Sequence, residues 1–190
     1  HHYGIDPGWI PVFYSNKGLY PWEAACAWQE GSKITIQLRE IFQKKDRFLF
    51  FYKKEEILAH EYLHAVRFPL ESSSYEEYFA YSVSTFFGNA FRAFVGPFFS
   101  KPADTVLFFL ALLFPLLGIY FETASFLMIP FFMIAIFGCR LALNWRRFRA
   151  AEKKVGLPLM VRLTDEEIDL FSTLSKEEIT AWIEGQSSFR

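Results

Sequence analysis

Two long apolar stretches near the middle of the chain limit most strongly what it can fold into. Residues 103–121 read ADTVLFFLALLFPLLGIYF and contain one charged residue, Asp104, near the start. Residues 124–145 read ASFLMIPFFMIAIFGCRLALNW and are uncharged up to Arg140, whose long side chain we expect to reach the nearby interface. A helix of about 20 apolar residues spans a hydrocarbon core of about 30 Å. We therefore expect a transmembrane helical hairpin over residues 102–146.

The alternative interpretation is a pair of buried core helices in a soluble protein. Against it, both stretches are apolar on all sides, and a chain of 190 residues has little else with which to bury them. Pro115 and Pro130 are compatible with membrane helices in which neighbouring groups satisfy the freed carbonyls.

Basic residues flank the hairpin on both sides and predict its orientation. Arg92 and Lys101 precede it, whereas the turn at residues 122–125 contains no Lys or Arg. Five basic residues follow it: Arg146, Arg147, Arg149, Lys153 and Lys154. The positive-inside rule therefore predicts an integral membrane protein with two transmembrane helices and cytoplasmic N- and C-termini, as in a bacterial inner membrane, with the lipid bilayer as a partner.

Composition excludes two other classes of protein. Lys and Arg number 20 against 21 Asp and Glu, a balance that excludes a dedicated nucleic-acid binder. With 52% hydrophobic residues the chain cannot be intrinsically disordered. We expect Cys26 and Cys139 to be free thiols in a reducing compartment. His1 and His2 resemble the remnant of an expression tag and are not counted as candidate metal ligands.

The segment before the hairpin mixes strand and helix patterns. We expect a short strand around residues 9–14 and a short helix over residues 22–30. KITIQL at residues 33–38 alternates apolar and polar residues and predicts a half-buried strand. A helical pattern runs from residue 54 to about residue 68, where Pro69 ends it.

A second helix is expected to begin at the serines of residues 72–74 and to reach about residue 95. After the hairpin, residues 157–163 could be extended. Two capping boxes, Thr164 to Glu167 and Ser175 to Glu178, then predict two short helices.

One of the helical segments carries the pattern HExxH. His60 and His64 stand four residues apart, so they share one helix face and can reach one zinc ion. Glu61 lies on the adjacent face, where it can receive the proton of a metal-activated water. The alternative is two histidines that happen to flank a glutamate. Chance alone would produce the pattern in a chain this long less than about once in a hundred cases.

A catalytic zinc usually has three protein ligands. The chain lacks a third histidine in the metzincin pattern, because the glycine and histidine of that pattern would fall at Arg67 and Leu70. The third ligand is then a carboxylate, and the candidates are Glu71, Glu76 and Glu77.

At this point the chain resembles the gluzincins, which are zinc peptidases with HExxH on one helix and a glutamate on the next. Several gluzincin branches have that glutamate in a Glu-x-x-Ala setting. Residues 77–81, EYFAY, fit the setting, whereas Glu76 would put Phe79 at the Ala position. The resemblance therefore implies one Zn²⁺ per chain, held by His60, His64 and Glu77.

Helix geometry also favours Glu77 as the third zinc ligand. Glu76 lies about 100° from Glu77 around the second helix and should face away from the histidines, and Glu71 should lie in the connecting loop. The alternative role for Glu77 is a capping box with Ser74. The short separation of His64 and Glu77 is most similar to that of the minigluzincins, and the resemblance covers about residues 33–90.

The resemblance also implies a substrate that pairs with an edge strand and a side chain that steadies the oxyanion. The strand over residues 33–38 is the candidate edge, with Ile34 and Ile36 as substrate-binding residues. Tyr75, Tyr78 and Tyr81 are unranked candidates for the oxyanion donor.

Together these features predict an α+β protein with three parts. Residues 3–101 form a small zincin-like catalytic domain with an active-site helix and a glutamate helix. Residues 102–146 form the transmembrane hairpin. Residues 147–190 form a short, helical, cytoplasmic C-terminal segment that packs on the catalytic domain.

The expected function is a membrane-anchored zinc endopeptidase with a cytoplasmic active site near the bilayer. Its substrate would be a peptide or protein, including one associated with the membrane. One alternative is a site-2-type intramembrane protease, but Lys53, Lys54 and two glutamates precede HExxH closely. Another is a non-enzymatic membrane adaptor, although a structural zinc site would need four ligands, mostly thiolates.

Overall fold

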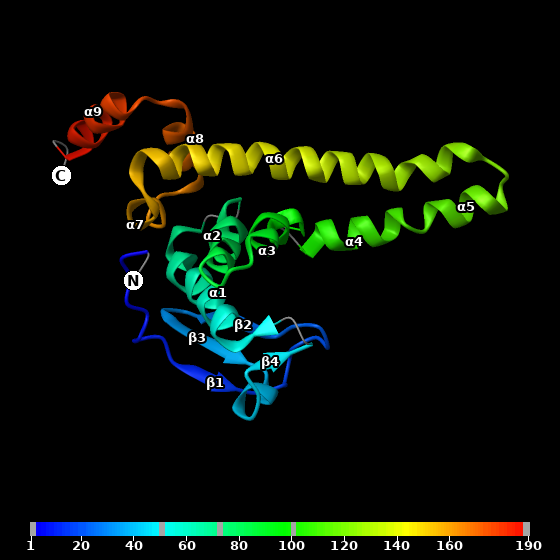
Figure 1. The fold of residues 1–190 in the computed structure, drawn as a ribbon, viewed down its shortest axis with the longest axis horizontal. Helices are drawn as coiled ribbons and strands as arrows, with labels where there is room; N and C mark the ends of the chain where they lie inside the picture. Colours follow the sequence, from blue (N-terminus) through cyan, green and yellow to red (C-terminus); the bar gives the residue numbers. More distant parts are fainter. Residues whose placement is uncertain (1–2, 50–51, 72–73, 100–101, 188–190) are drawn as a thin grey trace.

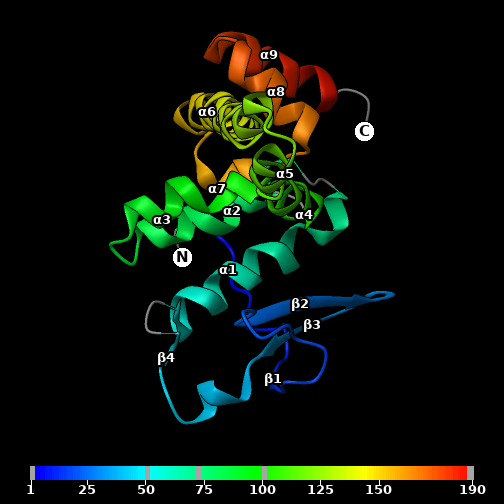
Figure 2. The ribbon, with the colours of Figure 1, turned by 90° about the vertical axis from the view of Figure 1, so that its right-hand side faces the viewer.

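The computed structural model describes residues 3–49, 52–71, 74–99 and 102–187, and within them the chain mixes helices with a small sheet (Figure 1). Figure 2 shows the arrangement in layers. The sheet lies at one end and α1 (Lys54–Arg67) lies against it. α2 (Glu76–Ser82) and α3 (Ala90–Val95) follow, and the long helices and the C-terminal helices lie beyond them. The expected mixture of helix and sheet is thus confirmed.

Three strands form the main sheet: β1 (Val12–Tyr14), β2 (Ala25–Glu30) and β3 (Lys33–Leu38). Their order is β1-β3-β2, with β1 parallel and β2 antiparallel to β3. β3 buries Ile34, Ile36 and Leu38, as its alternating pattern predicts.

The helix expected over residues 22–30 is wrong, because most of that segment is β2. Glu30 pairs with Lys33 across a two-residue turn at Gly31 and Ser32. Gly31 has a φ of +60°, a conformation that costs glycine little and that tight hairpin turns require. Pairing with β3 along the whole of β2 therefore outweighs the helical tendency that the sequence of this segment suggested.

A second, two-stranded ribbon leads into α1. β4 (Arg47–Phe48) and β5 (Tyr52–Lys53) pair antiparallel, and α1 begins at the next residue. The helix expected from residue 54 is confirmed. It ends at Arg67, where a 3₁₀ turn (Phe68–Leu70) carries Pro69.

α1 is packed from both sides, which fixes its orientation. Ile57 and Ala65 belong to the hydrophobic cluster that α1 shares with the sheet. Leu63 belongs to a second cluster, formed with α2 and the C-terminal half of the chain. The polar side chains of α1 therefore occupy a fixed place between the two clusters.

The expected single helix to residue 95 is wrong, because the chain breaks after α2. A 3₁₀ turn (Val83–Thr85) follows, and Gly88 has a φ of +77°. Asn89 then caps α3, accepting a hydrogen bond from the backbone of Arg92. A left-handed glycine followed by an asparagine N-cap ends one helix and begins another.

The capping alternative for Glu77 is also wrong. Tyr75 precedes α2, and no side-chain hydrogen bond caps this end of the helix. The backbone N–H of Ser74 instead donates to Asp165, at 2.6 Å. The other serines proposed as caps, residues 72–73, lie outside the described residues.

The hairpin is formed by α4 (Pro102–Ala111), α5 (Phe114–Tyr120), a 3₁₀ turn (Ala124–Met128) and α6 (Ile129–Val155). It projects away from the rest of the protein (Figure 1). Two segments, Ala103–Tyr120 and Ser125–Val155, are long and apolar enough to cross a membrane. Only 17% of the apolar window in each is buried, whereas core helices of a soluble protein would be mostly buried.

Proline and one ion pair shape the hairpin. α4 ends at Ala111 because the ring of Pro115 interferes with the carbonyl four residues earlier.

The guanidinium of Arg140 binds both carboxylate oxygens of Asp104, with N–O distances of 2.6 and 3.1 Å. Asp104 lies in the first turn of α4, so this ion pair lies at the base of the hairpin, and the expectation that Arg140 reaches an interface stays a prediction.

The C-terminal part begins within α6, which continues unbroken past residue 146. α7 (Leu157–Met160) is helical rather than extended, because Gly156, with a φ of +77°, redirects the chain and Pro158 lies in the first turn. The capping box from Thr164 to Glu167 opens α8 (Asp165–Thr173), as predicted. Both hydrogen bonds of the second box, between Ser175 and Glu178, open α9 (Lys176–Ser187).

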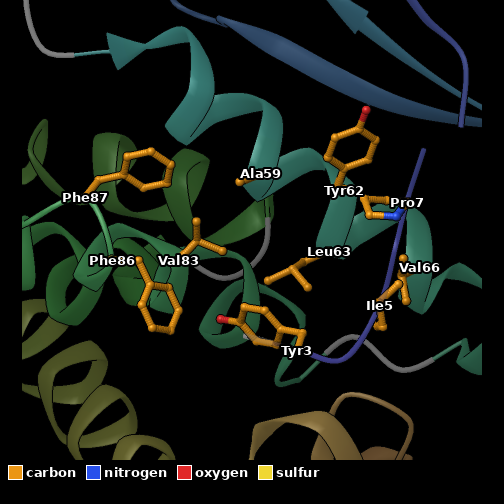
Figure 3. A pocket seen from close by; sticks show the side chains of 10 residues that line it. All are labelled: Tyr3, Ile5, Pro7, Ala59, Tyr62, Leu63, Val66, Val83, Phe86 and Phe87. Atoms are coloured by element: carbon orange, nitrogen blue, oxygen red, sulfur yellow. The ribbon is translucent and has the colours of Figure 1, made fainter. Parts of the chain in front are cut away.

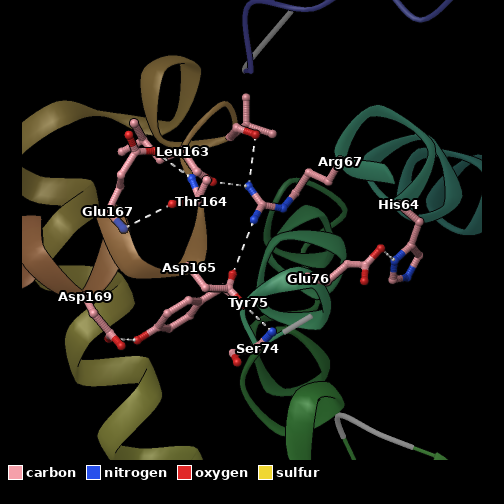
Figure 4. A network of polar contacts seen from close by, with 11 residues as sticks. His64, Arg67, Ser74, Tyr75, Glu76, Leu163, Thr164, Asp165, Glu167 and Asp169 are labelled. Carbon is pink, nitrogen blue, oxygen red and sulfur yellow. Dashed lines mark hydrogen bonds and ion pairs between the residues drawn. The ribbon is translucent and has the colours of Figure 1, made fainter. Parts of the chain in front are cut away.

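Buried Arg67 joins α1 to this C-terminal part (Figure 4). Its Nη1 donates to the backbone carbonyls of Val161 and Leu163, at 3.0 and 3.1 Å. The same guanidinium lies 4.3 Å from the centre of the Phe79 ring on α2. One side chain thus connects α1, α2 and the chain that follows α6.

Candidate metal centre

Three side chains from α1 and α2 converge on one point. Nε2 of His60 and Nε2 of His64 are 3.1 Å apart. The carboxylate of Glu77 lies 3.9 Å from the first of these nitrogens and 3.6 Å from the second. Within the described parts of the chain, these three residues form the group of His, Cys, Asp and Glu whose donor atoms could hold a metal ion.

The spacing fits a zinc ion. Ligand atoms about 2.0–2.1 Å from a tetrahedral zinc are separated by about 3.3–3.4 Å. The observed separations of 3.1 to 3.9 Å bracket that value. Two imidazoles and one carboxylate also suit zinc chemically and leave a fourth position for another ligand. Glu71 does not belong to this group, and His1 and His2 lie outside the described residues.

Each histidine has a second partner that orients its ring. Oε1 of Glu76 lies 3.0 Å from Nδ1 of His64 (Figure 4). The His60 imidazole is hydrogen-bonded to the backbone carbonyl of Ala80. Such outer partners fix the tautomer of a metal-binding histidine and raise its basicity.

The expectation that Glu76 faces away is therefore wrong. Glu76 is the first residue of α2, and this end of the helix lies beside His64. The two consecutive carboxylates contact opposite nitrogens of one imidazole, Glu76 at Nδ1 and Glu77 at Nε2. An angular separation of about 100° around α2 is what allows them to do so.

The two histidines differ in their affinity for a proton. Burial, the neighbouring His64 and Arg92 lower the pKa of His60 well below its ordinary value. Burial also lowers the pKa of His64, but the hydrogen bond with Glu76 and the charges of Glu77 and Glu61 outweigh it and raise the pKa to about 9. In the metal-free protein one proton is thus held by the pair at neutral pH, and a bound cation would displace it.

Glu61 lies beside the cluster in a nearly dry environment. Burial raises its pKa to about 7, helped by the charge of Glu77 and opposed by His64 and by a hydrogen bond from the backbone of Ala27. A carboxyl group with a pKa near neutrality can both accept and return a proton at neutral pH.

A cavity of about 150 Å³ opens at the cluster. Its walls come from α1, α2, α3, β5 and the start of β2, and its lining includes His60, Glu61, Tyr81, Arg92 and Ala25. Because these elements are separate in sequence, the sheet, α1 and α3 must all be in place to form the cavity.

Only one of the three candidate tyrosines lies at the cluster. The Tyr81 ring is 4.6 Å from the His60 ring and lines the cavity. The hydroxyl of Tyr75 donates to Asp169, and Tyr78 is fully buried against Trp145. Tyr75 and Tyr78 are thus directed towards α6 and α8, which excludes them as oxyanion donors.

The edge strand differs from the expected one. β3 lies between β1 and β2, and Ile34 and Ile36 are buried in the core, so their assignment to an edge is wrong. β2 is the outer strand on this side, and its Ala27 contacts Glu61. The alternation of residues 33–38 predicted a strand but not the place of that strand in the sheet.

A second cavity, of about 330 Å³, lies on the opposite face of α1 (Figure 3). Ala59, Tyr62, Leu63 and Val66 contribute to it from α1, and Tyr3 lines it from the N-terminal segment. Among the residues that the structure describes, its lining contains no His, Cys, Asp or Glu that could bind a metal ion.

The sequence did not identify Arg92 as a site residue. A signal was nevertheless present, because Arg92 is the only charged residue between Glu77 and Lys101. A lone charge in so apolar a segment needs a partner or a function.

Comparisons of the chain with models of known protein families, with curated proteins and with solved structures found no match.

Proposed function

We propose that the protein is a membrane-anchored, zinc-dependent peptidase of the gluzincin type. The observation that carries the proposal is the convergence of His60, His64 and Glu77, with donor atoms 3.1 to 3.9 Å apart and Glu61 beside them. A zinc ion held there supplies Lewis-acid chemistry, which polarises a carbonyl and makes water acidic enough to attack it near neutral pH.

The surrounding residues have distinct roles in this proposal. Glu61 accepts a proton from the attacking water and returns it to the leaving amine. Glu76 and the carbonyl of Ala80 hold the two imidazoles so that Nε2 of each faces the ion. Tyr81 donates a hydrogen bond to the developing oxyanion. The outer edge of β2 pairs with the backbone of an extended peptide.

The two apolar segments favour a membrane anchor over a soluble enzyme. In this proposal the hairpin crosses the bilayer, and the zinc centre lies on the cytoplasmic side close to its surface. The basic residues after the hairpin support this orientation, because Arg146 and Arg149 follow the apolar part of α6.

The alternatives fit the geometry less well. An intramembrane protease would carry HExxH on a membrane helix, whereas α1 packs between the sheet and α2. A structural zinc site would have four protein ligands, whereas the described residues supply three.

Glu61→Gln separates metal binding from chemistry and tests the proposal. We expect the purified full chain to contain about one zinc per chain, and the Glu61→Gln variant to keep the zinc but lose peptide hydrolysis. His60→Ala and His64→Ala should lower the zinc content measured by elemental analysis. Cleavage by Glu61→Gln at the wild-type rate would show that the proposed mechanism is wrong.

A further inference from the structure

Arg92 is a largely buried cation in the wall of the cavity at the metal centre. Its side chain is 15% exposed, and its Nε lies 3.6 Å from Oε1 of Glu56, which is itself buried. The hydroxyl of Ser84 donates to the same carboxylate oxygen, at 2.6 Å. The guanidinium carbon lies 4.6 Å from the centre of the Tyr52 ring. These contacts hold the guanidinium in place before any ligand arrives.

The guanidinium keeps hydrogen-bonding capacity. It has five N–H donors, and a separation of 3.6 Å from Glu56 is too long for a hydrogen bond. Its Nη1 is buried without a hydrogen-bond partner among the described residues. Leaving a buried charged donor unpaired is costly, so a cation held in this way is suited to a ligand that arrives later.

Arg92 is also close to the metal ligands. Its guanidinium carbon lies 5.9 Å from the centre of the Tyr81 ring, and that ring lies 4.6 Å from the ring of His60. An extended peptide advances about 3.4 Å per residue. A group bound by Arg92 therefore belongs to a residue within about three positions of the bond held at the metal.

We infer that Arg92 binds a carboxylate of the substrate, so that the preferred substrates carry a carboxylate within about three residues of the cleaved bond. The inference rests on the proposed peptidase function. Planar carboxylates match the two-pronged geometry of guanidinium donors better than any other group of a peptide. The carboxylate can come from the C-terminus of the peptide or from an Asp or Glu side chain.

Two acidic residues share the cavity and limit where the ligand can lie. Glu61 is at the metal side. Glu23 lies two residues before β2, and its carboxylate accepts a hydrogen bond from the backbone of Tyr20 at 2.8 Å. A substrate carboxylate must therefore approach from the side of Arg92. Because Glu23 repels it, Glu23→Gln should strengthen the preference for acidic substrates.

Four peptides of one parent sequence test the inference with the zinc-loaded full chain in detergent. The first has a free C-terminus and the second an amidated one. The third and fourth are amidated and carry Glu or Gln two residues beyond the cleaved bond. We expect the wild type to cleave a carboxylate-bearing peptide with a kcat/KM about 10- to 100-fold above that of its neutral counterpart. A difference between the free and amidated peptides would identify the C-terminal carboxylate as the ligand. A difference between the Glu and Gln peptides would identify a side-chain carboxylate.

Arg92→Met should abolish this preference, so that the ratio of kcat/KM between each carboxylate-bearing peptide and its neutral counterpart falls to about one. Since that change leaves the buried carboxylate of Glu56 without a positive charge beside it, the double variant Arg92→Met/Glu56→Gln is measured as well, with zinc content and melting temperature as controls of folding. Arg92→Lys should keep part of the preference. Equal kcat/KM values for all four peptides with the wild type, or an equal loss on all four with the double variant, would overturn the inference.

Binding separates this inference from the proposed function. The Glu61→Gln variant should bind the carboxylate-bearing peptide more tightly than the neutral one, and Arg92→Met in that background should remove the difference. If the wild type cleaves no peptide but this binding difference is present, the proposed function fails and the carboxylate site stands. If cleavage occurs without any difference in binding, the carboxylate site fails and the peptidase stands.

Discussion

Oε1 of Glu76 lies 3.0 Å from Nδ1 of His64, on the side of the imidazole opposite to the nitrogen that faces His60 and Glu77. His64 is thus held between two consecutive glutamates of α2, of which one orients the ring and the other stands at the candidate metal position. This arrangement gives Glu76 and Glu77 different roles although they are neighbours of the same residue type.

The first prediction separates these two roles. Glu77→Ala should lose zinc because it removes a ligand. Glu76→Ala should keep the three ligands and weaken zinc binding by about 10- to 100-fold, because His64 loses the partner that orients it. Competition with a chelator of known affinity measures both effects. Glu71→Ala is the matched control, since Glu71 lies outside the cluster.

The outcome that contradicts this assignment is equally clear. If Glu76→Ala releases zinc as completely as Glu77→Ala, Glu76 is itself a ligand. If Glu76→Ala has no effect on zinc affinity, its contact with His64 does not orient the ring.

The second prediction concerns the tyrosine at the cavity. Tyr81→Phe should lower kcat by about 100- to 1,000-fold with unchanged zinc content, because removal of one oxyanion donor has effects of this size. Tyr75→Phe is the control, since its hydroxyl is bound to Asp169 away from the cluster. It should change the melting temperature but not kcat. Steady-state kinetics on one peptide substrate compare the two, and an unaltered kcat for Tyr81→Phe would remove Tyr81 from the mechanism.

The parts of the fold that were predicted from the sequence are those set by local spacing. The four-residue separation of His60 and His64 placed both on one face of α1, and the length and composition of the apolar stretches identified α4 to α6. Glu77 was chosen from its local setting and lies beside the histidines. In each case the decisive residues are close together in the chain.

The parts that were missed depend on how distant elements pack. β2 is a strand because it pairs with β3, and Ile36 is central because β1 lies on its other side. Glu76 contacts His64 because of the place where α2 begins. Arg92 reaches the cavity only because the chain turns at Gly88 and returns as α3. None of these contacts is fixed by the spacing of neighbouring residues.

The third prediction tests the ion pair of the hairpin. Asp104 is nearly buried and Arg140 is about one-third exposed, and their contact is bidentate. Breaking a fully buried pair costs about 3–5 kcal/mol, and because solvent reaches Arg140 we expect about 1–2 kcal/mol here. Asp104→Asn and Arg140→Gln should each lower the melting temperature in detergent. The double variant should lose less than the sum of the two, whereas strict additivity would mean that the pair contributes nothing.

The fourth prediction uses the thiol of Cys26 as a probe of the environment beside the candidate metal centre. Burial, together with the charges of Glu61 and Glu23, raises the pKa of this thiol to about 11. Since the thiolate is the reactive form, alkylation at pH 7 should be about 100-fold slower than for a thiol with a pKa of about 9. The rate should rise about tenfold per pH unit up to about pH 11. An exposed cysteine introduced at Glu166 is the reference, and equal rates at pH 7 would contradict the raised pKa.

The last prediction fixes the orientation of the hairpin in the membrane. Ser125 lies in the 3₁₀ turn at the start of the second apolar segment, and Glu166 lies in α8 beyond the basic end of α6. Both side chains are exposed. With Cys26 and Cys139 replaced by alanine, an impermeant maleimide added to intact cells should label Ser125→Cys and spare Glu166→Cys. Permeabilised cells should show labelling of both, which controls for access to each thiol. The physical reason is the absence of Lys and Arg from the turn, against five basic residues within residues 146–154 that favour the cytoplasmic side. Labelling of Glu166→Cys alone in intact cells would place the candidate metal centre, which Arg67 ties to the same C-terminal part of the chain, on the outer side of the membrane.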